Sequence, residues 1–226
     1  MIFDVVARMR GRMRGALVAG VLLSSACNGF AQTSGCDIQL GGGYGPFDYQ
    51  DPENKVPTPA DPMGRIKRVE NVHFRPETEF LQVRNVERLA SDIQYTLNIF
   101  PNNFRALISL SRLELKLGGR LPPNSNGKSA ECRFNYAFDF KPDDPYVLMA
   151  YGIHNHLRKQ NKEALQAYKQ AEALGLDATQ FNYNFGLLYF DLGDYDNALL
   201  YAKKAYDAGF QLPGLKSKLQ SIGKWE

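Results

Sequence analysis

Two histidines, His154 and His156, form a pair with the appearance of a metal-ligand motif. On a helix, residues two positions apart point about 200° away from each other, so both side chains cannot bind one ion. His73 has no carboxylate, cysteine or serine at a diagnostic spacing, and the chain contains no CxxC motif for zinc. We therefore interpret the histidines as structural, and the sequence predicts neither a metal site nor a cofactor.

The remaining residues with catalytic chemistry lie in patterns typical of turns and helix starts. The three glycines at 41–43 lack the Lys-Ser/Thr and the preceding strand of a phosphate loop. Asp143 and Asp144 stand at a helix start, and Asp191 and Asp194 in a turn. The nucleophile and metalloprotease motifs GxSxG and HExxH are absent. The sequence therefore predicts a protein that is not an enzyme. An enzyme acting on envelope glycans or peptides would need carboxylates that converge only in the fold.

The first 31 residues have the pattern of an export signal. A basic region is followed by an apolar run at 15–23 and by Gly29 and Ala31, which fit a small-x-small cleavage site. A second interpretation makes Cys27 a lipidated N-terminus, because residues 22–27 (LLSSAC) partly match a bacterial lipobox. A third is an ordinary cytosolic N-terminus. The basic residues are Arg8, Arg10, Arg12 and Arg14.

Removal of residues 1–31 makes the charge balance uninformative about nucleic acids. The whole chain has 27 basic and 24 acidic residues, and removing four arginines and Asp4 leaves 23 of each. No basic stripe interleaved with aromatic residues occurs elsewhere, so the sequence disfavours nucleic-acid binding. The apolar run of about nine residues is far shorter than the roughly 20 that a membrane-spanning helix needs. We expect a periplasmic or secreted protein, or a lipoprotein anchored through Cys27.

Cleavage after Ala31 would leave two cysteines, Cys36 and Cys132. Two thiols in an exported protein favour one disulfide, because the compartment is oxidising. The bridge would connect the N-terminal segment to a helix predicted at 129–140. Two unrelated buried thiols are the alternative.

Residues 32–85 differ in composition from the rest of the chain. Closely spaced prolines between 52 and 62 exclude a regular helix there and favour an extended segment. This segment is either a flexible linker or an ordered strap held by Tyr44, Phe47 and Tyr49. We favour the strap, because linkers avoid large aromatic side chains. The alternating pattern at 67–74 predicts an edge strand.

Small residues recur in the C-terminal half at a constant offset of 34 residues, and a tyrosine occupies a similar position in each copy. A period of 34 is that of the tetratricopeptide (TPR) helix–turn–helix repeat, and the sequence resembles this family. The glycines would allow close approach within a helix pair, and the alanines would lie where helices press together. The residues are Gly152, Ala164, Tyr168 and Ala171 in one copy and Gly186, Ala198, Tyr201 and Ala205 in the next.

The resemblance implies an all-α solenoid of about three helical pairs over residues 86–212. A degenerate first copy would have helices at 104–117 and 129–140, with an insertion near 120–127, preceded by an orphan second helix at 86–100. Asp144 and Asp194 would be helix N-caps. Residues 213–226 would form a capping helix with Leu215, Leu219 and Ile222 on its buried face.

The resemblance also implies a concave groove lined by the first helix of each pair. Its predicted lining has two arginines at one end and aromatic and aliphatic residues beyond them. Such a surface suits a peptide with an acidic group near one end. The lysine/asparagine clamp of chaperone-binding TPR proteins is not reproduced. We therefore expect a periplasmic adaptor that binds a peptide or protein partner. A structural envelope protein whose groove is filled by its own N-terminal segment is the alternative. The groove residues would be Arg105, Ile108, Arg112, Tyr146, Met149, Ile153, His156, Tyr183, Leu187 and Phe190.

Overall fold

A computed structural model describes residues 36, 43–123 and 127–225. All of them belong to one compact unit, Gln32–Glu226. The predicted signal peptide and the lipidation at Cys27 therefore lie outside the described residues, as do two of the three glycines at 41–43.

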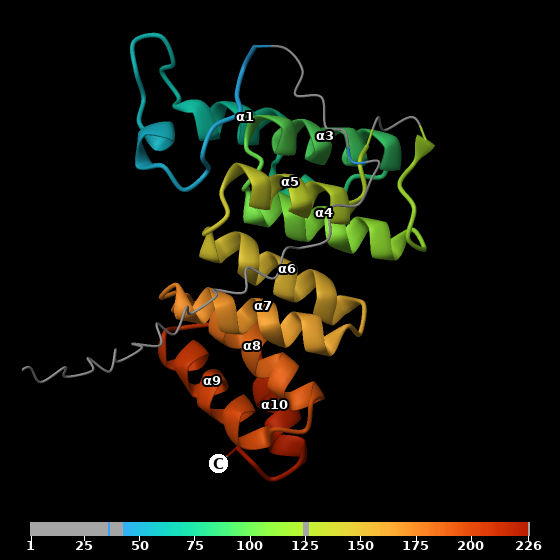
Figure 1. Cartoon of the computed structure of the whole chain (residues 1–226), viewed down its shortest axis with the longest axis vertical. Coiled ribbons are helices and arrows are strands. Elements are labelled where there is room, and N and C mark those ends of the chain that lie inside the picture. The colour runs from blue at the N-terminus through green and yellow to red at the C-terminus, as the bar shows by residue number, and fades with distance from the viewer. Residues whose placement is uncertain (1–35, 37–42, 124–126, 226) are drawn as a thin grey trace, which may run out of the picture. The chain divides into compact units, whose positions relative to one another are not determined.

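The described residues form helices joined by turns (Figure 1). They contain no strand, only an isolated bridge between Thr58 and Asp61. The all-α prediction is therefore confirmed. The elements are η1 (Pro52–Lys55), α1 (Arg65–His73), α2 (Pro76–Glu79), α3 (Val86–Ile99), α4 (Phe104–Lys116), α5 (Ala130–Phe140), α6 (Pro145–Leu157), α7 (Asn161–Ala173), α8 (Thr179–Asp191), α9 (Tyr195–Asp207) and α10 (Gly214–Ser221).

The last two helix pairs repeat each other at the spacing found in the sequence. α6 begins at Pro145 and α8 at Thr179, while α7 begins at Asn161 and α9 at Tyr195, so both offsets are 34 residues. α6 packs against α7, and α8 packs against α9. Because a short turn joins the helices of each pair, each pair is an antiparallel hairpin.

Local capping explains where these helices begin. The Asp144 carboxylate accepts hydrogen bonds from the backbone N–H groups of Tyr146 and Val147, with Pro145 in the first helical position. Asp194 accepts a hydrogen bond from the N–H of Asn197. Both residues are N-caps, as predicted.

The small residues of the repeat lie where neighbouring elements meet. A Cβ at Gly152 would lie 2.9 Å from Cε2 of Tyr168, and one at Gly186 would lie 2.6 Å from Cδ2 of Leu215. Each glycine thus leaves room for a side chain of another helix. The other repeat residues, Ala164, Tyr168, Ala171, Ala198 and Ala205, are buried in the core.

The N-terminal segment is more helical than the sequence indicated. The edge strand predicted at 67–74 is wrong, because α1 occupies Arg65–His73. A strand there would need a partner for its backbone groups, whereas a helix satisfies them internally. Ile66 and Val69, three residues apart, form the buried face of α1. The extended description also fails for α2 and η1, and it fits residues 43–51 best.

Residues 43–51, hereafter the strap, pack onto the first helices. Tyr49 is buried, and its ring meets those of Phe100 and Phe104 at centroid distances of 5.9 and 6.1 Å. The N–H of Phe47 donates to the carbonyl of Ile99 at 2.8 Å. The strap interpretation, rather than the flexible linker, fits these contacts.

A polar cluster fastens the strap to the start of α6. The fully buried Asn102 amide donates to Asp48 and to Asp144, at 2.7 Å each, and accepts the N–H of Tyr49 at 2.9 Å. Lys141 forms an ion pair with Asp48. Burial tends to raise the pKa of Asp48, but the hydrogen bonds from Lys141 and Asn102 outweigh it and lower the pKa below its usual value. Burial prevails at Asp144, whose pKa is raised.

The C-terminal helix covers the last hairpin. Leu215 and Leu219 of α10 are fully buried, and Trp225 packs edge-on against Tyr206 with ring centroids 5.4 Å apart. The prediction for Ile222 is wrong, because its side chain is 41% exposed. α10 ends at Ser221, so Ile222 no longer follows the helical periodicity that buries the two leucines.

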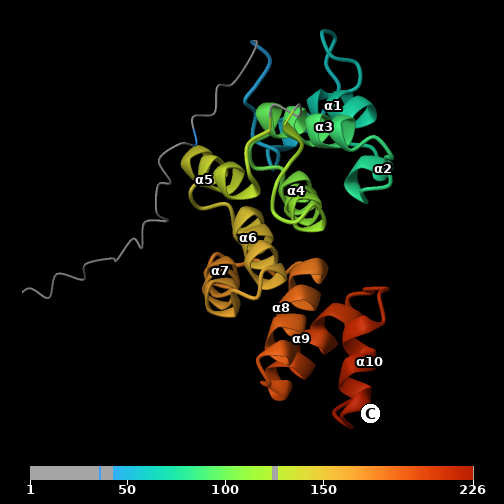
Figure 2. The same ribbon diagram turned by 90° about the vertical axis from the view of Figure 1, so that its right-hand side faces the viewer.

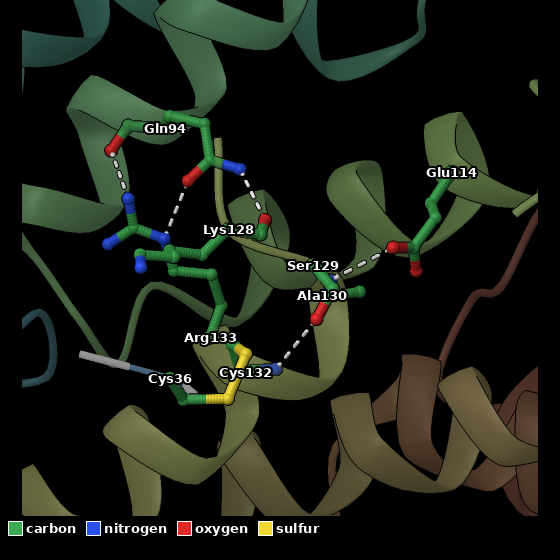
Figure 3. Close-up of a disulfide and its surroundings, with 8 residues drawn as sticks. All are labelled: Cys36, Gln94, Glu114, Lys128, Ser129, Ala130, Cys132 and Arg133. Carbon is green, nitrogen blue, oxygen red and sulfur yellow. Dashed lines mark hydrogen bonds between the residues drawn. A yellow bond between two sulfur atoms is a disulfide. The ribbon is translucent and has the colours of Figure 1, made fainter. Parts of the chain in front are cut away.

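The structure contains the predicted disulfide between Cys36 and Cys132, with Cα atoms 5.3 Å apart (Figure 3). It joins Cys36 to the first turn of α5, which contacts two other helices. Arg133 donates to the Gln94 side chain of α3 at 2.6 Å, and the Ala130 N–H donates to Glu114 of α4 at 3.4 Å. The disulfide therefore fastens Cys36 to a helix that is itself held by side-chain hydrogen bonds.

Candidate functional site

The first helices α4, α6 and α8 follow one another along the stack, with α10 next to α8 (Figure 2). We call the surface formed by α4, α6 and α8 the first-helix face. α2 contacts α4, and α10 contacts α8. Figure 2 shows α2 and α10 on the same side of the stack, so they flank this face at its two ends.

Four of the predicted groove residues belong to the core instead. Ile108, Met149 and Ile153 are 3%, 1% and 4% exposed, because successive first helices pack directly on one another. Tyr183 is 9% exposed, with its ring stacked on Phe210 at 4.2 Å. Their assignment as groove residues is wrong. The repeat pattern predicted which side of each first helix these residues occupy, but it did not predict that neighbouring helices would bury them.

Arg105 is already engaged within the chain. Its guanidinium makes a two-pronged contact with the Glu79 carboxylate of α2, with Nε 2.9 Å from Oε1. It also donates to Glu70 at 3.0 Å and to the Tyr49 hydroxyl at 3.2 Å. The hydrogen bonds to Glu79 raise the pKa of Arg105, although burial opposes this.

α2 has a second attachment at the same place. The Ser109 hydroxyl of α4 donates to the backbone carbonyl of Glu79 at 2.9 Å. An acidic helical turn of this chain therefore lies against α4, with its carboxylate bound in the bidentate geometry that arginine favours. Sequence reasoning missed Glu79, because it precedes Arg105 by 26 residues in a segment interpreted as extended.

Arg112 lies seven residues after Arg105, about 10.5 Å along the same side of α4. Its side chain is exposed, and within the described ranges it makes no hydrogen bond or ion pair. The hydroxyl of Tyr168 is buried without a hydrogen-bond partner in the described residues. Burial raises the pKa of Tyr168, and the positive charge of Arg112 acts in the opposite direction. Burial also lowers the pKa of Arg112. An arginine without an ion-pair partner is suited to an anion.

The C-terminal end of the first-helix face carries a second polar cluster. His156 of α6 and Lys218 of α10 approach the Asp191 carboxylate at 3.0 and 3.2 Å. Lys218 also lies over the Phe190 ring, 4.8 Å from its centroid. Burial tends to raise the pKa of Asp191, but the hydrogen bonds from His156 and Lys218 outweigh it and lower the pKa. This cluster connects three helices.

The other groove residues supply apolar surface between these clusters. Tyr146 is half-buried, with its ring 5.1 Å from that of Phe104, and Leu187 is half-buried on α8. The first-helix face thus has an acid-binding arginine at one end, an unengaged arginine next to it, and aromatic and aliphatic surface beyond.

The histidines have separate partners. His154 is buried, with Nδ1 2.7 Å from the Ser111 hydroxyl and Nε2 3.2 Å from Glu131, so it connects three helices. The hydrogen bond from His154 lowers the pKa of Glu131, although burial opposes this. His73 pairs with Asp92 of α3 at 2.8 Å, a contact between helices that no sequence spacing indicated. The described residues contain no group of three or more His, Cys, Asp or Glu side chains that could hold a metal ion.

No family model matches the chain, and no curated protein or solved structure is significantly similar to it. In the part of the chain that the structure describes, no helix combines the length and apolar character needed to cross a membrane.

Proposed function

We propose that this protein is an exported TPR-type adaptor that binds an acidic helical segment of a protein partner on its first-helix face. The 34-residue repetition of α6–α7 by α8–α9 supports the repeat assignment. The Cys36–Cys132 disulfide supports an oxidising compartment, such as the periplasm, because disulfides persist there.

One observation carries the proposal. The chain places an acidic helical turn of its own on this face, with Glu79 bound by Arg105. Arg112 offers the same chemistry two helical turns further along α4. A partner helix would place a carboxylate at Arg112 and its apolar side on Tyr146 and Leu187.

A fluorescence-anisotropy titration with a labelled alanine-based helical peptide tests this proposal. The peptide carries a central glutamate pair, and a second peptide carries glutamines instead. A hydrogen bond to a charged group contributes about 1.5–3 kcal/mol. We therefore expect Arg112→Ala to weaken binding of the glutamate peptide roughly 10- to 100-fold. Lys169→Ala, on the exposed side of α7, is the matched charge control and should change little. Equal binding of both peptides, or an unaffected Arg112→Ala variant, would contradict the proposal.

The second candidate is a structural envelope protein whose first-helix face is occupied by its own N-terminal segment. The contacts of Arg105 with Glu70, Glu79 and Tyr49 favour it, because all three partners come from that segment. Glu79→Gln separates the two functions. An adaptor binds the glutamate peptide without this change, whereas a self-occupied face binds it only after Glu79 is neutralised.

A further inference from the structure

A hollow of about 290 Å³ opens beside α1, away from the residues that carry the proposed adaptor function. One strap residue, one α3 residue and four α1 residues line it, and α1 and α3 pack side by side (Figure 1). Its volume lies near the lower end of the range for ligand pockets, about 300–1,000 Å³. It therefore has room for a small ligand or one terminal residue, but not for a long peptide. The lining residues are Tyr44, Arg68, Val69, Val72, His73 and Tyr95.

Arg68 supplies hydrogen-bond donors at one end of the hollow. Its Nε and Nη2 atoms both contact the same oxygen of Asp61, Oδ1, at 3.1 and 3.0 Å. Nη1 makes no hydrogen bond to any described residue, and the side chain is 43% exposed. Since a guanidinium has five N–H groups, Arg68 can receive a carboxylate without releasing Asp61.

His73 supplies an acceptor at the other end. Its Nδ1 lies 2.8 Å from Oδ1 of Asp92, and an ionised carboxylate can only accept, so Nδ1 carries the proton. In the neutral ring Nε2 is then an acceptor, and it has no partner among the described residues. The ring lies on Tyr95 with centroids 4.1 Å apart, which holds its orientation. Arg88 approaches Asp92 at 3.6 Å and balances the charge of that carboxylate.

Apolar surface lies between the two ends. Arg68 and His73 are five residues apart on α1, about 7.5 Å along the helix axis. Val69 is buried beneath this stretch, whereas Val72 and Tyr95 are 57% and 41% exposed. The hollow thus presents a donor, an apolar floor and an acceptor in sequence.

We propose that this hollow binds the carboxyl-terminal residue of a peptide, or a free N-acyl amino acid, with an apolar side chain. The ligand carboxylate accepts from Nη1 of Arg68, the side chain lies on Val72 and Tyr95, and the amide N–H donates to Nε2 of His73. Asp61 and Asp92 stand next to the two polar ends, so a dianion such as phosphate is repelled more strongly than a single carboxylate. This site does not involve Arg112, so either proposal can fail without the other.

Titration of the disulfide-bonded protein by calorimetry tests the site with three probes. These are N-acetylphenylalanine, its carboxamide, which lacks the charge, and 3-phenylpropionate, which lacks the N–H. We expect N-acetylphenylalanine to bind at least tenfold more tightly than either of the others. Inorganic phosphate should not compete. Equal binding of the acid and the carboxamide, absence of binding at millimolar concentration, or competition by phosphate would overturn the proposal.

Two variants locate the binding. Val72→Glu puts a carboxylate on an exposed position of the floor and should reduce binding of N-acetylphenylalanine at least tenfold. Leu200→Glu, at a 50% exposed position of α9, is the matched control and should bind like the parent protein. Arg68→Gln should abolish the preference for the acid over the carboxamide. If Arg68→Gln does not fold, the Val72→Glu variant alone tests the site. Unchanged binding of N-acetylphenylalanine by Val72→Glu would contradict the proposal.

A further titration with a tripeptide distinguishes a peptide terminus from a free N-acyl amino acid as the ligand. N-acetyl-Ala-Ala-Phe with a free carboxyl group should match or exceed N-acetylphenylalanine if the site accepts peptide termini. Weaker binding of the tripeptide, with the acid preference kept, assigns the site to free N-acyl amino acids. Both results support the shared chemistry, and binding of neither probe contradicts it.

Discussion

Replacing Gly152 with alanine places a methyl group against a side chain that has no space to move. The new Cβ would lie 2.9–3.0 Å from three ring atoms of Tyr168, whose side chain is fully buried. That ring is stacked on Phe185 at 5.0 Å and meets Phe181 edge-on at 5.9 Å. Overpacking of this kind costs about 1–3 kcal/mol, and the better helix propensity of alanine returns up to about 1 kcal/mol. We expect a net destabilisation of about 1–2 kcal/mol.

Gly186 provides a matched control, because it is the same position one repeat later. Its new Cβ would meet the terminal methyl Cδ2 of Leu215 at 2.6 Å. Leu215 is also buried, but the end of a flexible leucine side chain shifts more easily than a stacked aromatic ring. The Ala198 carbonyl at 3.3 Å requires only a small shift. For Gly186→Ala the helix-propensity gain offsets most of the strain, so we expect a change below about 1 kcal/mol.

Urea unfolding of the oxidised protein, followed by circular dichroism at constant pH, measures both variants. The Gly152→Ala cost should also shrink when Tyr168 is replaced with leucine, because a smaller side chain gives the methyl group room. Equal destabilisation by Gly152→Ala and Gly186→Ala, or an unchanged cost in the Tyr168→Leu background, would refute the reasoning from local packing.

Three further changes test other parts of the fold. Reducing the Cys36–Cys132 disulfide, with a sequence separation of 96, should lower the free energy of unfolding by up to about 4.7 kcal/mol. Urea unfolding midpoints with and without reductant measure this. Equal midpoints would contradict a stabilising role of the disulfide. Asn102→Ala removes three hydrogen bonds between the strap and the start of α6 and should destabilise the protein by at least about 2 kcal/mol. Residues 43–51 should then be cleaved faster in limited proteolysis. An unchanged cleavage rate would contradict this prediction. Because the folded pKa of Asp48 is lowered, its stabilisation is present above the pKa of the unfolded chain and is lost as pH falls through the folded value. Below about pH 4 the parent should therefore lose more stability than Asp48→Asn, and parallel pH profiles would be inconsistent with this.

The helical repeats were predictable because their signals are local. Asp144 and Asp194 cap helices through backbone groups two or three residues away, and turns separate the hairpins at a fixed spacing. Small residues at the 34-residue offset marked where helices approach one another. Each of these features depends on neighbours in sequence, so one chain is sufficient to recognise it.

The first-helix face was predictable only in outline. The sequence indicated that Arg105 and Arg112 share one side of α4, but not that Glu79 would engage the first and leave the second. Burial of Ile108 and Tyr183 likewise depends on elements that pack across the hairpins. A repeat pattern predicts the direction in which a side chain points. Its exposure depends on which neighbouring helices pack against it.

The N-terminal segment shows the same division. Alternation of polar and apolar residues around Val69 fits a strand or a helix, and contact with α3, together with the lack of a strand partner in the described residues, decided for the helix. The pairs His73–Asp92 and Asp48–Asn102 join residues 19 and 54 positions apart, and only folding brings them together. The sequence by itself determined the helix positions and caps of the repeat, because those interactions span a few residues. Tertiary structure decided which polar groups are engaged and which remain available, because desolvation and pairing depend on distance in space.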